Sequence, residues 1–234
     1  MSEGIGERLG AVRARIQAAT GRAGRDAASV TLLAVSKGKS AQLVREAMRA
    51  GQRDFGENYA QELEAKVAEL AADAQGARFH FIGQLQRNKV AKVIACARVV
   101  HVVDRAELAR EIDKRAHAIG ARVRVFVEVN VGGEASKGGA APADLGALLD
   151  AVRACGSLDL AGLMAIPPDV DDAEAARPFF RRVRELRDEH GGPAALPELS
   201  MGMSHDFEIA IEEGATIVRV GTAIFGARAP REVA

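Results

Sequence analysis

The amino-acid sequence predicts an α/β protein: a single (β/α)8 barrel of the TIM type with an extra helix at its N-terminus. Strand-like and helix-like segments alternate to the end of the chain, which is typical of a parallel sheet built from right-handed βαβ units. The length of 234 residues is close to the roughly 250 residues of one such barrel. Apolar residues make up 48% of the chain, enough for one large core. We therefore expect a single domain over residues 1–234.

The first expected element is an amphipathic helix at about Glu3–Thr20. Its acidic residues and helical spacing differ from the apolar centre of a signal peptide. We therefore interpret this segment as part of the folded domain.

Short apolar segments bounded by turn residues predict the strands. The fifth is the clearest, because VRVFVEVN alternates β-branched residues with others, and the seventh is the weakest because it is very short. In chain order the expected strands are Val30–Ser36, Arg53–Gly56, Phe79–Gly83, Val99–Asp104, Val123–Asn130, Leu158–Met164, Leu199–Met201 and Thr216–Val220.

The segments between the strands carry apolar residues at helical spacing. The expected helices are Ala41–Ala50, Ala60–Ala72, Arg87–Ala95, Arg105–Ile119, Pro142–Ala154, Ala173–Glu189 and His205–Glu213. The glycine-rich stretch Gly132–Ala143 is expected to be a mobile loop after the fifth strand. An open doubly wound sheet is the alternative architecture, but no Gly-x-Gly-x-x-Gly turn follows the first strand, which disfavours its dinucleotide-binding version.

Composition excludes several classes of partner. Acidic and basic residues number 32 each and are interspersed, so nothing favours nucleic acid or an anionic membrane as the main partner. No apolar run is long enough to span a bilayer. The two cysteines, Cys96 and Cys155, lie in apolar helical stretches, so we expect no disulfide and a cytoplasmic location.

Polar residues stand where the expected strands end, which is where (β/α)8 barrels place their chemistry. Asp104 and Asn130 are more simply interpreted as helix caps or turn formers, and Glu57 as a solvated or paired loop acid. The full set is Lys37, Glu57, Asn58, Gln84, Asp104, Asn130, Ser200, Arg219, Gly221 and Thr222.

Lys37 directly follows the apolar strand VTLLAVS, so its side chain is expected at the barrel mouth. Most lysines lie on the surface, and that reading stays open. A lysine held at the mouth is partly desolvated, its pKa falls, and its neutral amine can attack an aldehyde.

The last two strands predict an anion site. Gly221 allows backbone N–H groups to approach a phosphate closely, and the Thr222 hydroxyl adds a donor. Phosphate sites recur after strands seven and eight of such barrels. Ser200 is expected to donate to the same phosphate, whereas Ser204 is expected to cap the helix beginning at His205. A glycine needed only for the turn is the simpler alternative.

The histidines form no predicted triad or zinc set. His80 and His101 are expected inside strands without partners at metal spacing, and His205 at the start of a helix. Tyr59, the one tyrosine, is interpreted as a packing residue at a helix start.

Six runs of residues occur in the following order: AVSKGKS, DFGENYAQE, HFIGQLQRNK, GLMAIPP, SMGMSHDFEIAI and VRVGTAIFG. Together they resemble the pyridoxal phosphate homeostasis protein family, over nearly the whole chain. The resemblance implies pyridoxal 5′-phosphate as cofactor and a fold similar to the barrel domain of alanine racemase. Gln84 stands at a position that varies in the family and is given no role.

The resemblance also implies which residues bind the cofactor. Lys37 would hold it as a Schiff base, Arg219 would face its pyridine nitrogen, and the serine, glycine and threonine at the last two strand ends would hold its phosphate. Asn58 and Met201 would lie beside it. The implied cofactor-binding residues are therefore Lys37, Asn58, Ser200, Met201, Arg219, Gly221 and Thr222. No catalytic residue and no metal ligand is expected.

Arg219 bears on whether the protein is an enzyme. Many enzymes that use this cofactor pair its ring nitrogen with an acid, which keeps the ring a strong electron sink. A guanidinium does not give up its proton, so it leaves the nitrogen an unprotonated acceptor. A structural ion pair is the alternative role.

Three functions are compared. The first is a carrier that influences the supply of pyridoxal phosphate and other B6 vitamers, with pyridoxal-phosphate-dependent apo-enzymes as recipients. The second is an amino-acid racemase, which would need an opposing tyrosine from an additional β domain; the sequence ends shortly after its eighth strand, and we expect no such domain. The third is a barrel enzyme with a sugar-phosphate substrate. We expect the first, without substantial turnover, and a monomer.

Overall fold

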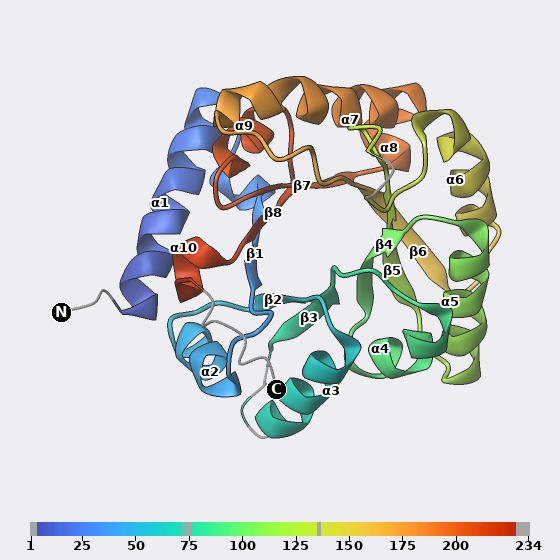
Figure 1. Cartoon of the computed structure of the whole chain (residues 1–234), viewed down its shortest axis with the longest axis horizontal. Coiled ribbons are helices and arrows are strands. Elements are labelled where there is room, and N and C mark those ends of the chain that lie inside the picture. Colours follow the sequence, from blue (N-terminus) through green and yellow to red (C-terminus); the bar gives the residue numbers. More distant parts are fainter. Residues whose placement is uncertain (1–3, 72, 74–75, 135–136, 228–234) are drawn as a thin grey trace.

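The computed structural model describes residues 4–71, 73, 76–134 and 137–227. In these residues eight parallel strands close into one barrel in the order β1 to β8, and β8 pairs with β1. Figure 1 looks down the barrel, with the strands inside a ring of helices. The predicted (β/α)8 barrel with an extra N-terminal helix is confirmed.

The strands lie where they were expected, with bounds that differ by a few residues. β7 is longer than expected, since the barrel provides pairing partners on both sides of it. The strands are β1 Thr31–Val35, β2 Asp54–Glu57, β3 Arg78–Phe81, β4 Val99–Val103, β5 Val123–Glu128, β6 Leu158–Met164, β7 Glu198–Met203 and β8 Ile217–Val220.

The helices also follow the expected order. They are α1 Ile5–Arg22, α2 Ala41–Arg49, α3 Ala60–Leu70, α4 Val90–Cys96, α5 Ala106–Ala118, α6 Leu145–Arg153, α7 Arg177–Glu189, α8 Gly192–Ala195, α9 Phe207–Glu212 and α10 Thr222–Phe225. The short helices α8 and α10 were not predicted, because one turn of helix has no periodicity to detect.

Three expected helices begin with a 3-10 turn instead of an α-helical turn: Arg87–Lys89 before α4, Pro142–Asp144 before α6 and Ala173–Ala176 before α7. Proline stands in the first turn of α7 and of the segment before α6. Its ring fixes φ and removes an N–H, so it is tolerated at a helix start. The expected end residues Glu3 and Ala72, and residues 135–136 of the expected loop, lie outside the described residues.

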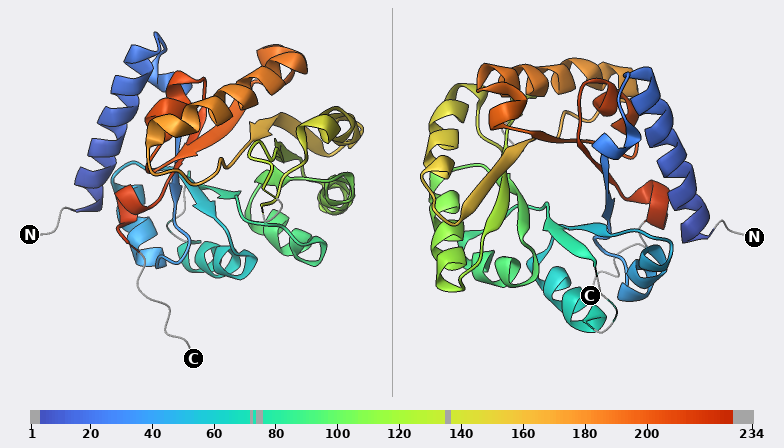
Figure 2. Two further views of the ribbon diagram at one scale, coloured as in Figure 1. Left: turned by 45° about the horizontal axis from the view of Figure 1, so that its top comes forward. Right: turned by 180° about the vertical axis from the view of Figure 1, so that it is seen from behind.

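Helix α1 completes the outer layer. It packs against α9, α10 and α2, in the position between the last and first helices of the ring (Figures 1 and 2). Its buried side chains, among them Leu9, Val12 and Ile16, form one stripe. On the same side Arg15 makes a two-fold hydrogen bond to Glu208 of α9. The N-terminal helix thus closes the gap that would otherwise follow β8.

The apolar core lies mainly between the strands and the helices, whereas the inside of the barrel is partly polar. Phe126 is fully buried and stacks on His101. Ser200 and Arg219 are buried in the same interior. Barrels of this type are usually filled with branched apolar side chains, so these polar residues need a specific explanation.

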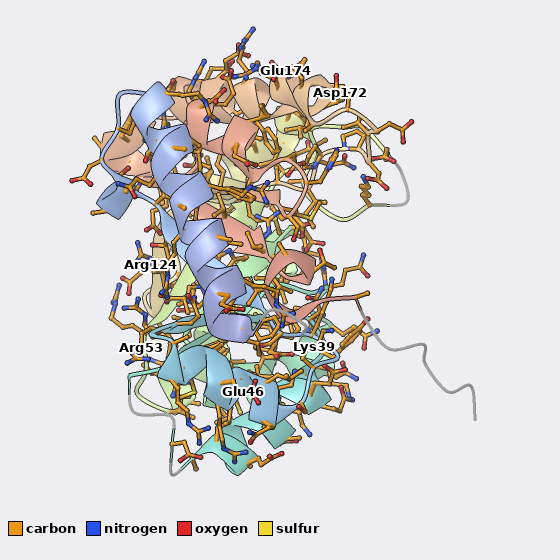
Figure 3. All side chains as sticks on the ribbon, turned by 90° about the vertical axis from the view of Figure 1, so that its left-hand side faces the viewer. Lys39, Glu46, Arg53, Arg124, Asp172 and Glu174 are labelled. Atoms are coloured by element: carbon orange, nitrogen blue, oxygen red, sulfur yellow. The ribbon has the colours of Figure 1, made fainter. Side chains whose placement is uncertain are left out.

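The two ends of the barrel carry different residues. In a parallel barrel all strands end on the same side, called the mouth here. Figure 3 shows Lys39, which follows β1, at the mouth, while Arg53 and Arg124, at the strand starts, lie at the opposite end.

Within the described residues, no helix combines the length and apolar character needed to cross a bilayer.

Candidate functional site

The barrel brings the predicted residues that follow three strands to the mouth. β1 pairs with β2 on one side and with β8 on the other. Lys37 after β1 therefore lies between Asn58, after β2, and Gly221, after β8. Residues separated by more than 180 positions thus meet at one end of the barrel.

Two lysines follow β1, and their surroundings differ. The Nζ of Lys39 donates to the carbonyl oxygens of Phe225, Gly226 and Ala227 at 3.2, 3.0 and 2.7 Å. Lys39 therefore ties the loop after β1 to the end of α10. Lys37 is half-buried and lies in the turn that follows β1, two residues after Val35. This position favours Lys37 as the reactive lysine.

A buried ion pair holds the residue before Lys37. The Ser36 hydroxyl donates to Glu57 Oε1 at 2.6 Å, and Lys66 donates to Glu57 Oε1 and to the Ser36 carbonyl, both at 2.6 Å. Glu57 is fully buried and ends β2, so the expectation of a loop acid is wrong, although it is indeed paired. Burial raises the pKa of Glu57, and the charge of Lys66 opposes this rise. This cluster lies outside the barrel wall and fixes the loop from which Lys37 projects.

Arg219 is buried, with an exposed fraction of 4%. Its Nη1 donates to the carbonyl and the hydroxyl of Ser200 at 2.6 and 2.9 Å, and its Nη2 donates to the Ala165 carbonyl at 3.0 Å. Burial lowers its pKa to about 10, while Glu128 and Asp206 act to raise it. The guanidinium stays charged at neutral pH and is held at a defined angle by neutral acceptors.

Ser200 lies below the mouth. Its side chain is fully buried, and its hydroxyl also lies 2.9 Å from His101 Nδ1. The hydroxyl is therefore engaged inside the barrel and not at the turn after β8, where the anion site was expected. These contacts favour a supporting role for Ser200 beneath Arg219.

Ser204 contacts the turn after β8, where the anion site was expected, and the phosphate role of Ser200 stays a prediction. Its hydroxyl accepts the Gly221 N–H at 3.2 Å. The expectation that Ser204 caps a helix is wrong, because α9 begins at Phe207 and its N-cap residue is Asp206. Thr222 is exposed beside this contact. Two strand ends thus present a serine hydroxyl, a threonine hydroxyl and backbone N–H groups together.

Gly221 is needed because the end of β1 lies very close to its backbone. A Cβ on Gly221 would lie 3.3 Å from the Val35 carbonyl oxygen, which is tighter than ordinary contact. A larger residue would push the turn after β8 away from the loop that carries Lys37.

A pocket of about 260 Å³ opens at the mouth beside Asn58, Gln84, Glu128 and Lys137. Asn58 Oδ1 is buried there without a hydrogen-bond partner. Burial and then the charge of Asp104 raise the pKa of Glu128 to about 7. Such a pocket presents an open acceptor and a carboxyl group that changes its charge near neutral pH.

Four other sequence expectations have these outcomes. Asn130 forms the expected turn, since its Nδ2 donates to the Glu134 carbonyl at 2.9 Å. Asp104 does not cap α5, whose N-cap residue is Arg105. Tyr59 stands at the start of α3, as expected, and is 43% exposed. Met201 is fully buried in β7, and its place beside the cofactor stays a prediction.

Sequence analysis missed a polar chain inside the barrel. His80 Nδ1 lies 2.9 Å from His101 Nε2, and His80 Nε2 lies 3.2 Å from Asp54 Oδ1. A histidine in each of two neighbouring strands was the available signal, but the register of β3 and β4 is needed to bring the two rings together. In the described part of the chain, no group of three or more histidine, cysteine, aspartate or glutamate side chains is arranged to hold a metal ion.

Comparison with known proteins gives consistent results. The family model described as "Alanine racemase, N-terminal domain" matches residues 8–229. A protein of Aquifex aeolicus named "Pyridoxal phosphate homeostasis protein" is 47% identical over 224 residues, 95% of this chain and 97% of its own. A Pseudomonas aeruginosa protein of the same name is 50% identical over 224 residues, 96% of each chain.

Solved structures show the same barrel. PipY of Synechococcus elongatus with PLP (pyridoxal 5′-phosphate) bound is 37% identical, with a TM-score of 0.82 over 95% of this chain and 100% of PipY. Alanine racemase of Corynebacterium glutamicum is 17% identical, with a TM-score of 0.66 over 94% of this chain and 61% of the racemase. The latter likeness concerns the fold alone.

Proposed function

Because this chain belongs to the family of pyridoxal phosphate homeostasis proteins, we propose that it binds pyridoxal 5′-phosphate at the barrel mouth and contributes to the homeostasis of this cofactor. PipY, the similar protein solved with this cofactor bound, supports the choice of ligand. Bound at a lysine, this cofactor supplies an electron-withdrawing ring that other proteins use in amino-acid chemistry.

The observation that carries the proposal is the pairing of β1 with β8, which places a strand-end lysine beside a turn with hydrogen-bonding groups. Lys37 follows β1, the Ser204–Gly221 contact joins the turns after β7 and β8, and the buried guanidinium of Arg219 lies on β8 inside the barrel. An aromatic aldehyde with a phosphate arm needs these three kinds of group. Asn58 Oδ1, buried without a partner, provides an acceptor beside them.

Lys37 is the proposed covalent anchor. Its amine would hold the cofactor covalently as a Schiff base. The Ser36–Glu57–Lys66 cluster fixes the loop that carries this lysine.

The phosphate would be held by Ser204, Gly221 and Thr222. Hydroxyl and backbone N–H donors to a phosphate are charge-assisted hydrogen bonds. Ser204 replaces Ser200 in this proposal, because the Ser200 hydroxyl is already engaged by Arg219 and His101.

Arg219 would donate to the pyridine nitrogen. Three of its hydrogen bonds go to Ser200 and Ala165, and a guanidinium has five N–H groups, so donors remain for a ligand. A guanidinium leaves the ring nitrogen unprotonated, which weakens stabilisation of a carbanion. We therefore propose a carrier without substantial turnover.

A second candidate, amino-acid racemisation, is favoured by one observation. Glu128 has a pKa of about 7 in the mouth pocket, a value suited to a general acid or base. The sole tyrosine, Tyr59, is exposed at the start of α3, and we propose no role for it as an opposing base.

The cellular part of the proposal concerns where the cofactor goes. We propose pyridoxal-phosphate-dependent apo-enzymes as recipients and a monomeric protein in the cytoplasm. The free cysteines Cys96 and Cys155 support a reducing compartment.

The covalent link is tested by borohydride. The loaded protein should absorb near the visible edge, and borohydride should fix the cofactor to the peptide that contains Lys37. Lys37→Ala should abolish the label. Lys39→Ala is the matched control and should keep it, because Lys39 binds carbonyl oxygens of α10. A label that survives Lys37→Ala and disappears in Lys39→Ala would contradict the assignment.

A further inference from the structure

A chain of polar side chains crosses the inside of the barrel. It begins with Arg78, whose Nε donates to Asp54 Oδ1 at 2.7 Å. It continues from Asp54 to His80 at 3.2 Å, from His80 to His101 at 2.9 Å and from His101 to Ser200 at 2.9 Å. The Ser200 hydroxyl then accepts from Arg219 at 2.9 Å. One unbroken path therefore joins the start of β2 and β3 to the proposed ligand of the cofactor ring.

The two ends of this path meet different surroundings. At the end away from the mouth, Asp54 and His80 line a pocket of about 250 Å³ together with Arg124 and Glu198. The Arg78 side chain is 67% exposed there. His101 and Ser200, in contrast, are fully buried. The path thus connects a region in contact with water to the site at the mouth.

We propose that the buried chain Asp54–His80–His101–Ser200 positions Arg219 for the cofactor ring and transmits to it the protonation state of the pocket at the opposite end of the barrel. This inference rests on the proposed function, since Arg219 must face the ring for the chain to act on the cofactor.

The direction of every hydrogen bond in the chain follows from its two ends. Arg219 can only donate, so Ser200 Oγ accepts from it. The Asp54 carboxylate can only accept, so His80 Nε2 carries a proton. With both histidines neutral, one arrangement satisfies all groups: Ser200 donates to His101 Nδ1, His101 Nε2 donates to His80 Nδ1, and His80 Nε2 donates to Asp54. Both rings are then Nε2–H tautomers.

One added proton reverses this direction. His80 as a cation donates from both nitrogens, so the proton between the rings moves from His101 Nε2 to His80 Nδ1. The added proton then occupies His101 Nδ1 and faces Ser200, which must accept from His101 and Arg219 at once. The serine hydroxyl turns to another acceptor, and the support beneath Arg219 changes.

The surrounding charges determine where the proton is stable. Burial, and after it the charges of His80 and Arg219, hold the pKa of His101 well below its usual range. Of the two rings, His80 is the one in contact with a carboxylate, that of Asp54 at 3.2 Å, so the proposal places the added proton's charge there. The charged groups around His80 come from several strands and are Asp54 of β2, Arg78 of its own strand, Arg124 of β5 and Glu198 of β7, while β1 contributes the uncharged Thr31.

A purely structural network is the simpler explanation, because buried polar groups need partners wherever they lie. It predicts that breaking the chain lowers stability alone. The proposed role predicts in addition that a change at Asp54 alters the bound cofactor at the opposite end of the barrel.

The experiment uses Asp54→Asn, which keeps the shape of the side chain. An amide can donate as well as accept, so His80 Nε2 no longer has to carry a proton. Its control is Asp159→Asn, which neutralises a carboxylate near the start of β6 that pairs with Arg122 and belongs neither to the chain nor to the pocket around His80. We expect Asp54→Asn to shift the pH midpoint of the bound cofactor's absorbance and to change its Kd by about fivefold, a common size for coupled sites. Asp159→Asn should leave both unchanged. Equal spectra and equal Kd values for the two variants would overturn the proposal.

A second measurement does not depend on the variants or on the cofactor. Nitrogen-15 NMR of the ligand-free wild type should show His80 and His101 as Nε2–H tautomers at neutral pH, with His101 changing to Nδ1–H as His80 is protonated. A His101 that stays Nε2–H throughout would overturn the proposal. Failure of the proposed function is distinguishable, because the wild type would then give no borohydride-stable label at Lys37.

Discussion

Glu128 is a buried carboxyl group whose pKa lies near neutral pH, so the stability of the fold depends on pH in a defined direction. Glu128 at the end of β5 is 8% exposed, and its pKa rises from 4.5 to about 7. Its neutral form is thus favoured in the folded protein. The contribution of this group to stability is full below pH 4.5 and is lost as the pH rises through 7.

Glu128→Gln should therefore stabilise the protein at pH 8 and have little effect at pH 4.5. A rise of the pKa from 4.5 to about 7 corresponds to roughly 3 kcal/mol at pH 8, at about 1.4 kcal/mol per pKa unit. Urea unfolding of wild type and variant at both pH values measures the difference. A constant difference between the two pH values would show that Glu128 titrates normally.

Among the elements, the two turns that follow β7 and β8 carry the phosphate hypothesis. Ser204 of the first turn and Gly221 of the second are joined by a hydrogen bond of 3.2 Å, whereas Ser200 lies inside the barrel. The two serines can therefore be separated by which part of the ligand they affect.

Ser204→Ala should weaken binding of pyridoxal 5′-phosphate about tenfold relative to pyridoxal, since one charge-assisted hydrogen bond contributes about 1.5 kcal/mol or more. Ser200→Ala should leave this ratio unchanged and lower stability, because it removes a partner of Arg219 and His101. Equilibrium titration with both ligands gives the ratios. The opposite pattern would return the phosphate role to Ser200.

At the scale of the whole molecule, the residues that the closed barrel brings together determine whether catalysis on amino acids is expected. A closed ring of strands places Lys37, Arg219 and Glu128 around a common mouth. In the proposed function Lys37 anchors the cofactor and Glu128 can exchange protons, but a guanidinium such as that of Arg219 would not protonate the ring nitrogen. Carrier and racemase therefore differ in one measurable quantity, the exchange of the amino-acid Cα proton.

We expect the loaded protein to show no exchange of this proton with deuterated solvent at an enzymatic rate, across the common amino acids. Lys37→Ala is the control that removes the anchor, and Glu128→Gln removes the one candidate base. Exchange that is lost in Lys37→Ala and falls about 10²–10⁴-fold in Glu128→Gln, the usual contribution of a positioned base, would identify an enzyme.

Local sequence was sufficient to predict most of the architecture. Apolar runs such as Thr31–Val35 and amphipathic stretches such as Ile5–Arg22 have a period of their own, and their alternation restricts the topology. Lys37 and Gly221 could be selected because each directly follows a strand, and strand ends meet at one side of a parallel barrel.

Contacts between distant segments determined the rest. Ser204 instead of Ser200 faces Gly221, Glu57 is buried against Lys66, and His80 meets His101. Each depends on the register between neighbouring strands or on the path of a turn, and a shift of one residue in a strand moves a side chain to the other face. The spacing of apolar residues along the sequence shows which side of a strand or helix is buried. Hydrogen bonds across the barrel join residues that come within reach only when all eight strands have closed.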